Sequence, residues 1–249
     1  MSFYHGVYKI INEVFIFNFF SSLQISALWD FFCFNVGGTT AEQSRGALSV
    51  LCMASKSSAA IVGSHIQDII DIGFGRWSKV DPLLARTACI AIQKLSEDDK
   101  KKLLAGNGNR VFDKLESLIT SSWLPENIWY AAVDKAIAAI YSIHPSPENI
   151  AANLVKKSLT SVFNGNKEVH LQTDIEGGEG DILTTVQIEK LSRYLFIASH
   201  VAMNQLVYIE SCTRKIQKQK AKYKMADGQT VHGNGATVAN GVKVSSPFV

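Results

Sequence analysis

The chain has 249 residues, of which 47% are hydrophobic and 19% are charged, and its formal net charge is +3. The length allows one large domain or two small ones, and the composition is ordinary for a folded protein with a sizeable core. The net charge is too small to argue for nucleic-acid binding, so any electrostatic case depends on where the charges lie.

Residues 1–22 form an atypical N-terminal segment that contains the apolar run Ile10–Phe20. Polar and charged residues interrupt this run, no basic segment precedes it, and no small-residue cleavage site follows it. We therefore expect no signal peptide and no membrane span. Two alternatives remain, which are an amphipathic first helix and a stretch foreign to the rest of the protein.

The first clear helix is expected to begin near Ala41. A glycine break at 37–38 precedes it, a threonine at 39–40 can cap it, and Glu or Gln at 42–43 can complete a capping box. Gly46 lies inside this helix, where glycine lowers helix propensity. We expect a neighbouring helix to approach closely there.

Two further helices are expected before residue 96. The first runs over 59–72, has apolar residues on one face and is ended by glycines at 73 and 75. The second begins with Asp81 as N-cap and Pro82 at the first helical position, where a missing N–H is harmless. Its buried stripe is predicted to be Leu84, Ala88, Ala91, Ile92 and Leu95.

The segment Ser96–Leu104 is predicted to be a short helical turn that Gly106–Asn109 ends, with a new helix after it. A third pair follows. Its first helix starts near Pro125 and has the apolar spacing i, i+3, i+4, i+7, and its second is opened by Ser146.

The remainder divides into three parts. Residues 164–181 are acidic and glycine-rich without a helical stripe, which predicts an exposed or disordered loop. Residues 182–224 predict one long helix with a basic end. Residues 225–249 are polar and glycine-rich, and we expect a disordered tail.

These elements predict an all-α fold, since no segment shows the alternation of a strand. Pro82 and Pro125 lie 43 residues apart, and Arg45 and Arg86 lie 41 residues apart. Such a period is typical of HEAT or armadillo repeats. Residues 23–163 are therefore predicted to form an α-solenoid of antiparallel helix pairs, continued by the long C-terminal helix, and such an array offers a long curved surface.

We predict no catalytic, cofactor or metal site. The acids gather in exposed patches such as 97–99, and the glycines and threonines at 37–40 lack the lysine of a phosphate-binding loop. We expect neither His65 nor His200 to find a ligand or nucleophile three or four residues later. Three tryptophans, Trp77, Trp123 and Trp129, are interpreted as packing residues.

The four cysteines, Cys33, Cys52, Cys89 and Cys212, are far apart and form no CxxC pair. Three of them lie in predicted helices among apolar residues. We interpret them as reduced core thiols, which favours an intracellular, reducing compartment.

One charged feature is more specific. The segment 214–224 holds six basic residues and no acid, and at helical spacing they surround much of the helix surface: Arg214, Lys215, Lys218, Lys220, Lys222 and Lys224. They can contact nucleic-acid phosphates or an acidic partner. The alternative is a solvated helix end with cations near the C-terminal dipole, and both interpretations stay open.

Four segments carry a family resemblance: SRGALSVLCMASKSSAAIVGSHIQDIIDIGFGRW, DPLLARTACIAIQKLSEDDKKKLL, WLPENIWYAAVDKAIAAIY and LSRYLFIASHVAMNQLVYIESCTRKIQKQKAK. They resemble condensin complex subunit 1, the larger HEAT-repeat non-SMC subunit of condensin I, in its plant form. The resemblance covers roughly residues 28–224 and only part of the family's longer chain.

The resemblance implies a regulatory scaffold rather than an enzyme. Such a subunit binds the kleisin, approaches the SMC ATPase heads, contacts DNA or chromatin and supports mitotic chromosome condensation, without a cofactor, a membrane or a small-molecule substrate. It implies the nucleus and the chromosome, with the cytoplasm open outside mitosis. The alternative is a generic α-solenoid adaptor that binds peptide segments in transport or signalling.

Overall fold

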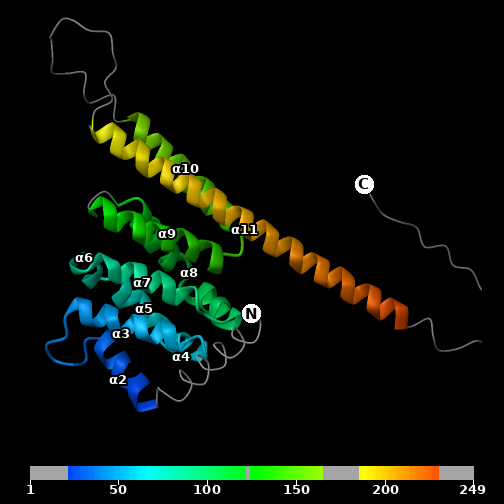
Figure 1. The fold of residues 1–249 in the computed structure, drawn as a ribbon, viewed down its shortest axis with the longest axis horizontal. Coiled ribbons are helices and arrows are strands. Elements are labelled where there is room, and N and C mark those ends of the chain that lie inside the picture. Colours follow the sequence, from blue (N-terminus) through cyan, green and yellow to red (C-terminus); the bar gives the residue numbers. More distant parts are fainter. Residues whose placement is uncertain (1–21, 122–123, 165–184, 230–249) are drawn as a thin grey trace, which may run out of the picture. The chain divides into compact units, whose positions relative to one another are not determined.

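The computed structural model describes residues 22–121, 124–164 and 185–229 (Figure 1). In these ranges the regular structure is helical and no strand occurs, so the all-α prediction is confirmed. The chain divides into two compact units, Met1–Gln205 and Leu206–Val249, which are described separately. The helices are α2 (Ser22–Phe32), α3 (Ala41–Ala54), α4 (Ala60–Gly63), α5 (Ile66–Gly73), α6 (Trp77–Val80), α7 (Pro82–Ile92), α8 (Glu97–Ile119), α9 (Glu126–Ile143), α10 (Pro147–Asn164) and α11 (Thr185–Gln229).

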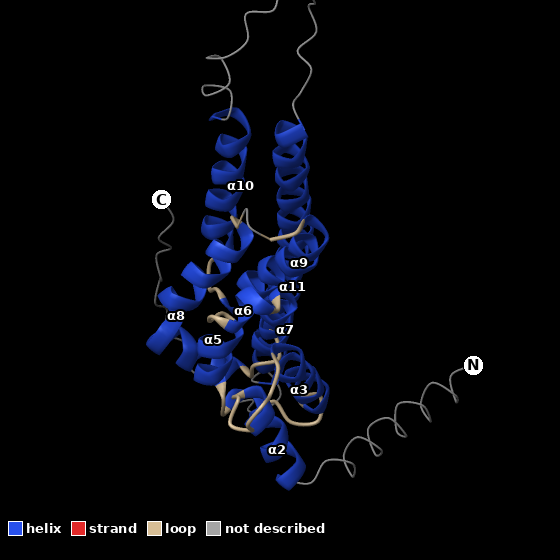
Figure 2. Ribbon diagram, turned by 90° about the vertical axis from the view of Figure 1, so that its left-hand side faces the viewer, coloured by secondary structure: helices blue, strands red, loops and turns tan. Residues whose placement is uncertain are grey.

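The first unit is built from helices in two layers. Helix α3 packs on α7 and α7 packs on α9, while α5, α8 and α10 contact this row from the other layer (Figure 2). Helix α2 packs against α3 at the start of the array. The HEAT/armadillo-like solenoid of helix pairs is thereby confirmed.

One apolar core runs through these layers. Its largest fully buried side chains come from successive helices, so each pair covers the stripe of the next: Phe32, Leu48, Leu51, Ile69, Ile70, Leu84, Ile92, Leu115, Ile119, Leu124, Trp129 and Ile137. The predicted stripe from Leu84 to Leu95 is buried. Burying such side chains stabilises each helix by roughly 1.5–3 kcal/mol per large residue, so neighbouring pairs stabilise one another.

The local start signals fold as predicted. Thr40 caps α3, since its Oγ1 accepts from the N–H of Gln43 at 3.2 Å and its own N–H donates to Oε1 of Gln43 at 2.9 Å. Asp81 caps α7 by accepting from the N–H of Leu83 at 3.1 Å. Nε of Arg45 donates to Oδ2 of the same Asp81 at 2.6 Å, so this cap also ties α3 to α7.

Two predictions of helix boundaries were wrong. The helix expected over 59–72 is interrupted at Ser64 and His65 and forms α4 and α5, and the short α6 follows. The expected turn at Gly106–Asn109 lies inside α8. Leu103, Val111 and Leu115 are buried on one face of α8, and this burial exceeds the cost of about 1 kcal/mol for each glycine in a helix.

The prediction for Gly46 was also wrong. A Cβ at Gly46 would meet nothing within 4 Å, because this exposed face of α3 has no neighbour there. The close approach occurs at Gly73 at the end of α5, where a Cβ would collide with the Cβ of Ala88 on α7. Packing between α5 and α7 therefore requires glycine at 73 and not at 46.

Helix α11 begins at Thr185 and ends at Gln229. Its end lies five residues beyond the predicted end at Lys224, so the first residues assigned to the tail are helical. The predictions for residues 1–21, for the loop at 165–181, for Trp123 and for the tail after Gln229 lie outside the described residues.

Candidate functional site

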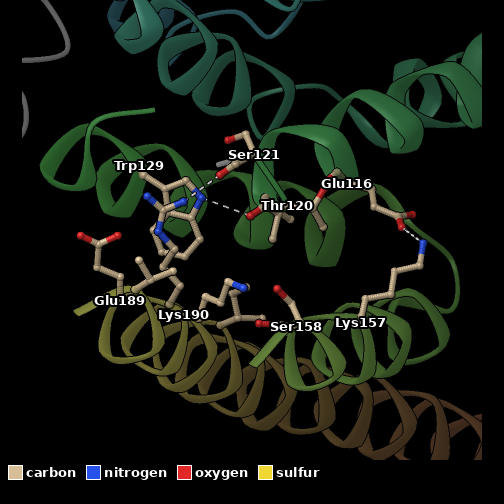
Figure 3. Close-up of a pocket in the computed structure, with 13 residues that line it drawn as sticks. Glu116, Thr120, Ser121, Trp129, Lys157, Ser158, Glu189 and Lys190 are labelled. Carbon is tan, nitrogen blue, oxygen red and sulfur yellow. Dashed lines mark hydrogen bonds and ion pairs between the residues drawn. The ribbon is translucent and has the colours of Figure 1, made fainter. Parts of the chain in front are cut away.

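The first unit contains a cleft of about 500 Å³ that is lined by the end of α8 and by α9, α10 and α11. We call it the α8–α11 cleft. Figure 3 shows side chains from the end of α8, including Glu116 and Thr120, facing Ser158 of α10 and Lys190 of α11. Trp129, Ile119 and Ile197 supply its buried apolar lining.

Arg193 on α11 fixes one wall of the cleft. Its guanidinium donates to the backbone carbonyls of Ser121 at 2.9 Å and Leu124 at 3.4 Å. It also lies over the ring of Trp129 at 4.9 Å. Nε1 of Trp129 donates in turn to the carbonyl of Ile119 at 3.1 Å. Arg193 therefore satisfies carbonyls after α8 that would otherwise face an apolar wall.

The sequence analysis did not single out Arg193. Its carbonyl acceptor at Ser121 lies 72 residues away along the chain, so no local pattern reveals the contact. A signal was present in the spacing, because Arg193, Phe196, Ile197 and His200 share one face of α11. Phe196 packs on Tyr130 at a ring distance of 4.7 Å, which places this face against α9.

The polar groups of the cleft do not converge as general acid and base. Glu116 pairs with Lys157 across the gap between α8 and α10, and the guanidinium of Arg193 is bound to carbonyls. Ser158 of α10 and Lys190 of α11 point into the cleft from neighbouring helices on the same side (Figure 3). The cleft therefore combines an apolar floor with a mixed polar rim.

A second concave region lies between α2 and α5 and has a volume of about 520 Å³. Here Nδ1 of His65 lies 2.9 Å from Oδ2 of Asp68, so the expectation that His65 has no partner three residues on was wrong. The imidazole also stacks on Trp29 at 4.0 Å. Burial, together with Asp68 and Asp30, raises the pKa of Cys33 to about 11, which disfavours a thiolate nucleophile beside this histidine.

The cysteines are free thiols. Cys52 and Cys89 are buried, which confirms the interpretation for these two, whereas Cys33 and Cys212 are half-buried. Burial raises the pKa of Cys52 to about 12 and raises that of Cys89 further. Among the described residues, no three His, Cys, Asp or Glu side chains gather as metal ligands.

The six predicted basic residues lie in the second unit, on the part of α11 that follows Leu206. Arg214 pairs with Glu210 at 2.6 Å. Lys215, Lys218, Lys220 and Lys222 are exposed, and none pairs with a described carboxylate. The side chain of Lys224 lies outside what the structure describes.

The sequence analysis expected the basic residues to surround much of the helix, but the register of α11 places four of them on one face. A helix turns about 100° per residue, so Arg214, Lys215, Lys218 and Lys222 fall on one face. We call these four residues the basic face. Position 220 falls on the opposite side. Because α11 continues to Gln229, its last turn contains no basic residue, and the C-terminal dipole, which acts over one turn, does not explain the cluster.

No protein-family description matches the chain. It is 67% identical over 202 residues to "Condensin-1 complex subunit CAP-D2" of Arabidopsis thaliana, which covers 81% of the chain and 14% of that protein. It is 27% identical over 216 residues to "Condensin complex subunit 1" of Schizosaccharomyces pombe, covering 82% of the chain and 19% of that protein.

The same name is carried by a protein of Saccharomyces cerevisiae that is 26% identical over 210 residues, covering 82% of the chain and 17% of the relative. The chain thus spans less than a fifth of the length of these relatives. In the described residues no helix is long and apolar enough for a membrane span. The three matches confirm the resemblance to condensin complex subunit 1, in its plant form and over part of that protein's length.

Proposed function

We propose that the chain acts as part of a non-enzymatic scaffold subunit of condensin that supports mitotic chromosome condensation. The identity of 67% with the Arabidopsis condensin subunit carries this proposal. In this role the array binds the kleisin, lies near the SMC ATPase heads and works on chromosomes in the nucleus. The stacked helix pairs support it, because a solenoid offers extended surface for partner chains.

The α8–α11 cleft is the surface that we propose for a partner segment. It combines the apolar floor at Trp129 with hydrogen-bonding groups at Ser158 and Lys190, which can hold the backbone and side chains of an extended peptide. A generic peptide-binding adaptor would use the same cleft. Retention of a condensin kleisin separates the two functions.

The deciding experiment is co-purification with a reconstituted SMC–kleisin core. We expect the chain to remain with the core through gel filtration. Ser158→Trp, which fills the cleft from α10, should release the kleisin, whereas Ser199→Trp, at an exposed position of α11, should not. The proposal would be refuted if both Trp variants stayed with the core, or if the unchanged chain did not stay with it.

DNA contact is a separate part of the proposal and rests on the basic face. Replacing Arg214, Lys218 and Lys222 with Gln should weaken the binding of duplex DNA. The slope of log K against log salt concentration should become shallower by up to about 2.7, since each of three phosphate contacts contributes roughly 0.9 to its magnitude. The control replaces three exposed cations on α8, Lys101, Lys102 and Lys114, with Gln. Equal effects of the two triple variants would mean that net charge alone attracts DNA.

A further inference from the structure

The α8–α11 cleft contains a cation that has no anion beside it. Lys190 of α11 is half-buried in the wall of the cleft, and its side chain points into it (Figure 3). Among the residues that the structure describes, no carboxylate or carbonyl pairs with its ammonium group. A charge that is partly withdrawn from water is stabilised by an opposite charge next to it. Lys190 is therefore placed to receive an anion from a bound partner.

The other charged side chains that line the cleft balance one another. Glu116 of α8 pairs with Lys157 of α10. Glu189 and Arg193 lie four residues apart on α11, a spacing at which opposite charges face each other and attract, whereas adjacent positions such as 189 and 190 do not face each other. Two carboxylates thus offset two of the three cations in the lining. The remaining positive charge belongs to Lys190.

A hydroxyl group faces the cleft on the same side as this ammonium. Ser158 of α10 is half-buried and points into the cleft (Figure 3). The nearby hydroxyl of Thr160 donates to the carbonyl of Lys156 at 2.9 Å, as is usual on a helix. No described group forms such a bond with the hydroxyl of Ser158. An ammonium and a hydroxyl are both donors, and the two oxygens of one carboxylate can accept from both.

The single unbalanced charge favours a carboxylate over a phosphate as the bound anion. A phosphorylated side chain carries about −1.5 to −2 charges at pH 7. Lys190 offsets one of them, and Glu116 and Glu189 line the same cleft, so the second negative charge would be repelled. A carboxylate carries one charge and matches the ammonium. The anion that fits is the side chain of Asp or Glu.

An exposed apolar side chain lies one turn away on the same helix. Val186 lines the cleft and is 58% exposed. It precedes Lys190 by four residues, which is about 6 Å along the helix axis. In an extended chain, residues two apart point to the same side and are separated by about 6.6 Å. A segment that runs along α11 therefore reaches Val186 and Lys190 together with two side chains that are two residues apart.

We propose that the α8–α11 cleft binds an extended segment of a partner polypeptide in which an apolar residue, any residue and an acidic residue follow one another. The carboxylate accepts from Lys190 and Ser158, and the apolar side chain covers Val186. The cleft volume of about 500 Å³ lies in the ordinary range of ligand pockets. This inference rests on the proposed function, in which the same cleft is the docking surface for a partner segment.

The test measures the binding of fluorescent peptides to the full chain by anisotropy. The probe peptide contains Leu-Ser-Glu in a background of Gly and Ser, and the matched peptides contain Leu-Ser-Gln or Leu-Glu. We expect Leu-Ser-Glu to bind about tenfold more tightly than Leu-Ser-Gln, because the neutral amide loses the charge-assisted hydrogen bonds. It should also bind more tightly than Leu-Glu, whose side chains point to opposite sides. Equal binding of the Glu and Gln peptides, or none by either, would overturn the proposal.

Exchange of charges locates the contact within the cleft. Lys190→Glu should reverse the preference, so that the variant binds a Leu-Ser-Lys peptide more tightly than Leu-Ser-Glu. A purely structural role of Lys190 would not produce this reversal. Lys156→Glu is the matched control, because Lys156 is exposed on α10 and does not line the cleft, so the parental preference should remain. A Lys190→Glu variant that still prefers Leu-Ser-Glu would show that the carboxylate binds elsewhere.

The apolar contact is tested in the same way. Val186→Ser should weaken the binding of Leu-Ser-Glu several-fold, since the leucine loses an apolar surface to cover. Because Val186 is exposed, circular dichroism and the thermal midpoint should stay those of the parent. Unchanged binding by this variant would remove the apolar position from the proposed pattern and overturn it.

Two further results separate the alternatives. The segment 165–184 of this chain contains five acidic residues, and peptide binding that appears only after they are replaced with Asn and Gln would assign the cleft to that segment and overturn the proposal. Retention of the chain by the SMC–kleisin core without binding of an acidic peptide would overturn this inference and leave the proposed function intact. Peptide binding as expected, without retention by the core, would support the inference and refute the condensin role.

Discussion

Replacing Arg193 with Lys tests how α11 is held in the first unit. Lysine keeps the charge but cannot direct two N–H groups at the carbonyls of Ser121 and Leu124, and it loses the planar contact with Trp129. A hydrogen bond from a charged donor contributes about 1.5–3 kcal/mol, and a cation–π contact contributes about 0.5–2 kcal/mol. Because Lys can still reach one carbonyl, we expect a net loss of about 2 kcal/mol.

Thermal and urea unfolding of the chain measure this loss. In a unit of this size, 1 kcal/mol corresponds to about 2–4 °C in Tm, so Arg193→Lys should lower Tm by about 4–8 °C. The control is Arg214→Lys on the same helix, where the side chain is 70% exposed and the ion pair with Glu210 contributes little. A shift no larger for Arg193 than for Arg214 would refute the argument that the carbonyls after α8 depend on the guanidinium.

Three other predictions concern the glycines at 46 and 73, the cap of α8 and the thiol of Cys33. Gly73→Ala should destabilise the fold by about 1–3 kcal/mol, because the added Cβ would collide with Ala88 on α7. Gly46→Ala should stabilise the fold by about 0.5–1 kcal/mol. A urea midpoint that is higher for Gly73→Ala than for Gly46→Ala would contradict the structure. Ser96→Ala removes the α8 cap and should cost about 1 kcal/mol at pH 7. The hydrogen bond from Ser96 lowers the pKa of the Asp99 carboxyl in the folded chain. The stability that this bond contributes is therefore present at pH values above the pKa of a free aspartate, and it is lost as the pH falls through the pKa of Asp99 in the folded chain. The difference in unfolding free energy between Ser96→Ala and the parent should thus be smaller at pH 3 than at pH 7. With its pKa raised to about 11, Cys33 should react slowly with iodoacetamide at pH 8 and faster up to about pH 11, and rapid native alkylation at pH 8, seen by mass spectrometry, would contradict its burial.

The sequence predicted those features whose causes are local. Asp81 could be assigned as a cap, and the cap of α3 could be narrowed to Thr39 or Thr40, because the N–H groups that they accept from lie two or three residues away. The fold class followed from the spacing of apolar residues and from the repeat period. Gly106–Asn109 was misjudged because glycine is a local helix breaker, while the burial that keeps α8 intact comes from contact with α9.

The candidate surfaces were predicted only in part, for the same reason. The six basic residues were visible in the sequence, but the alignment of Arg214, Lys215, Lys218 and Lys222 on one face depends on α11 continuing in a single register. The α8–α11 cleft could not be foreseen, since Trp129 and Arg193 are 64 positions apart. Its lining depends on which helix pairs become neighbours, and no short motif encodes that.

The interior and the exterior of this chain place different demands on its side chains. Inside, no buried side-chain polar atom of the described residues lacks a hydrogen-bond partner, so a core substitution acts first on stability. On the surface of α11, Ile209 and Ile216 are already half exposed, so replacing them removes little burial from the free chain. Their substitution should leave the thermal midpoint within about 2 °C of the parent, since exposed positions usually change stability by less than about 0.5 kcal/mol. A loss of binding caused by such a substitution, without a change in the thermal midpoint, would therefore report a lost contact and not a lost fold.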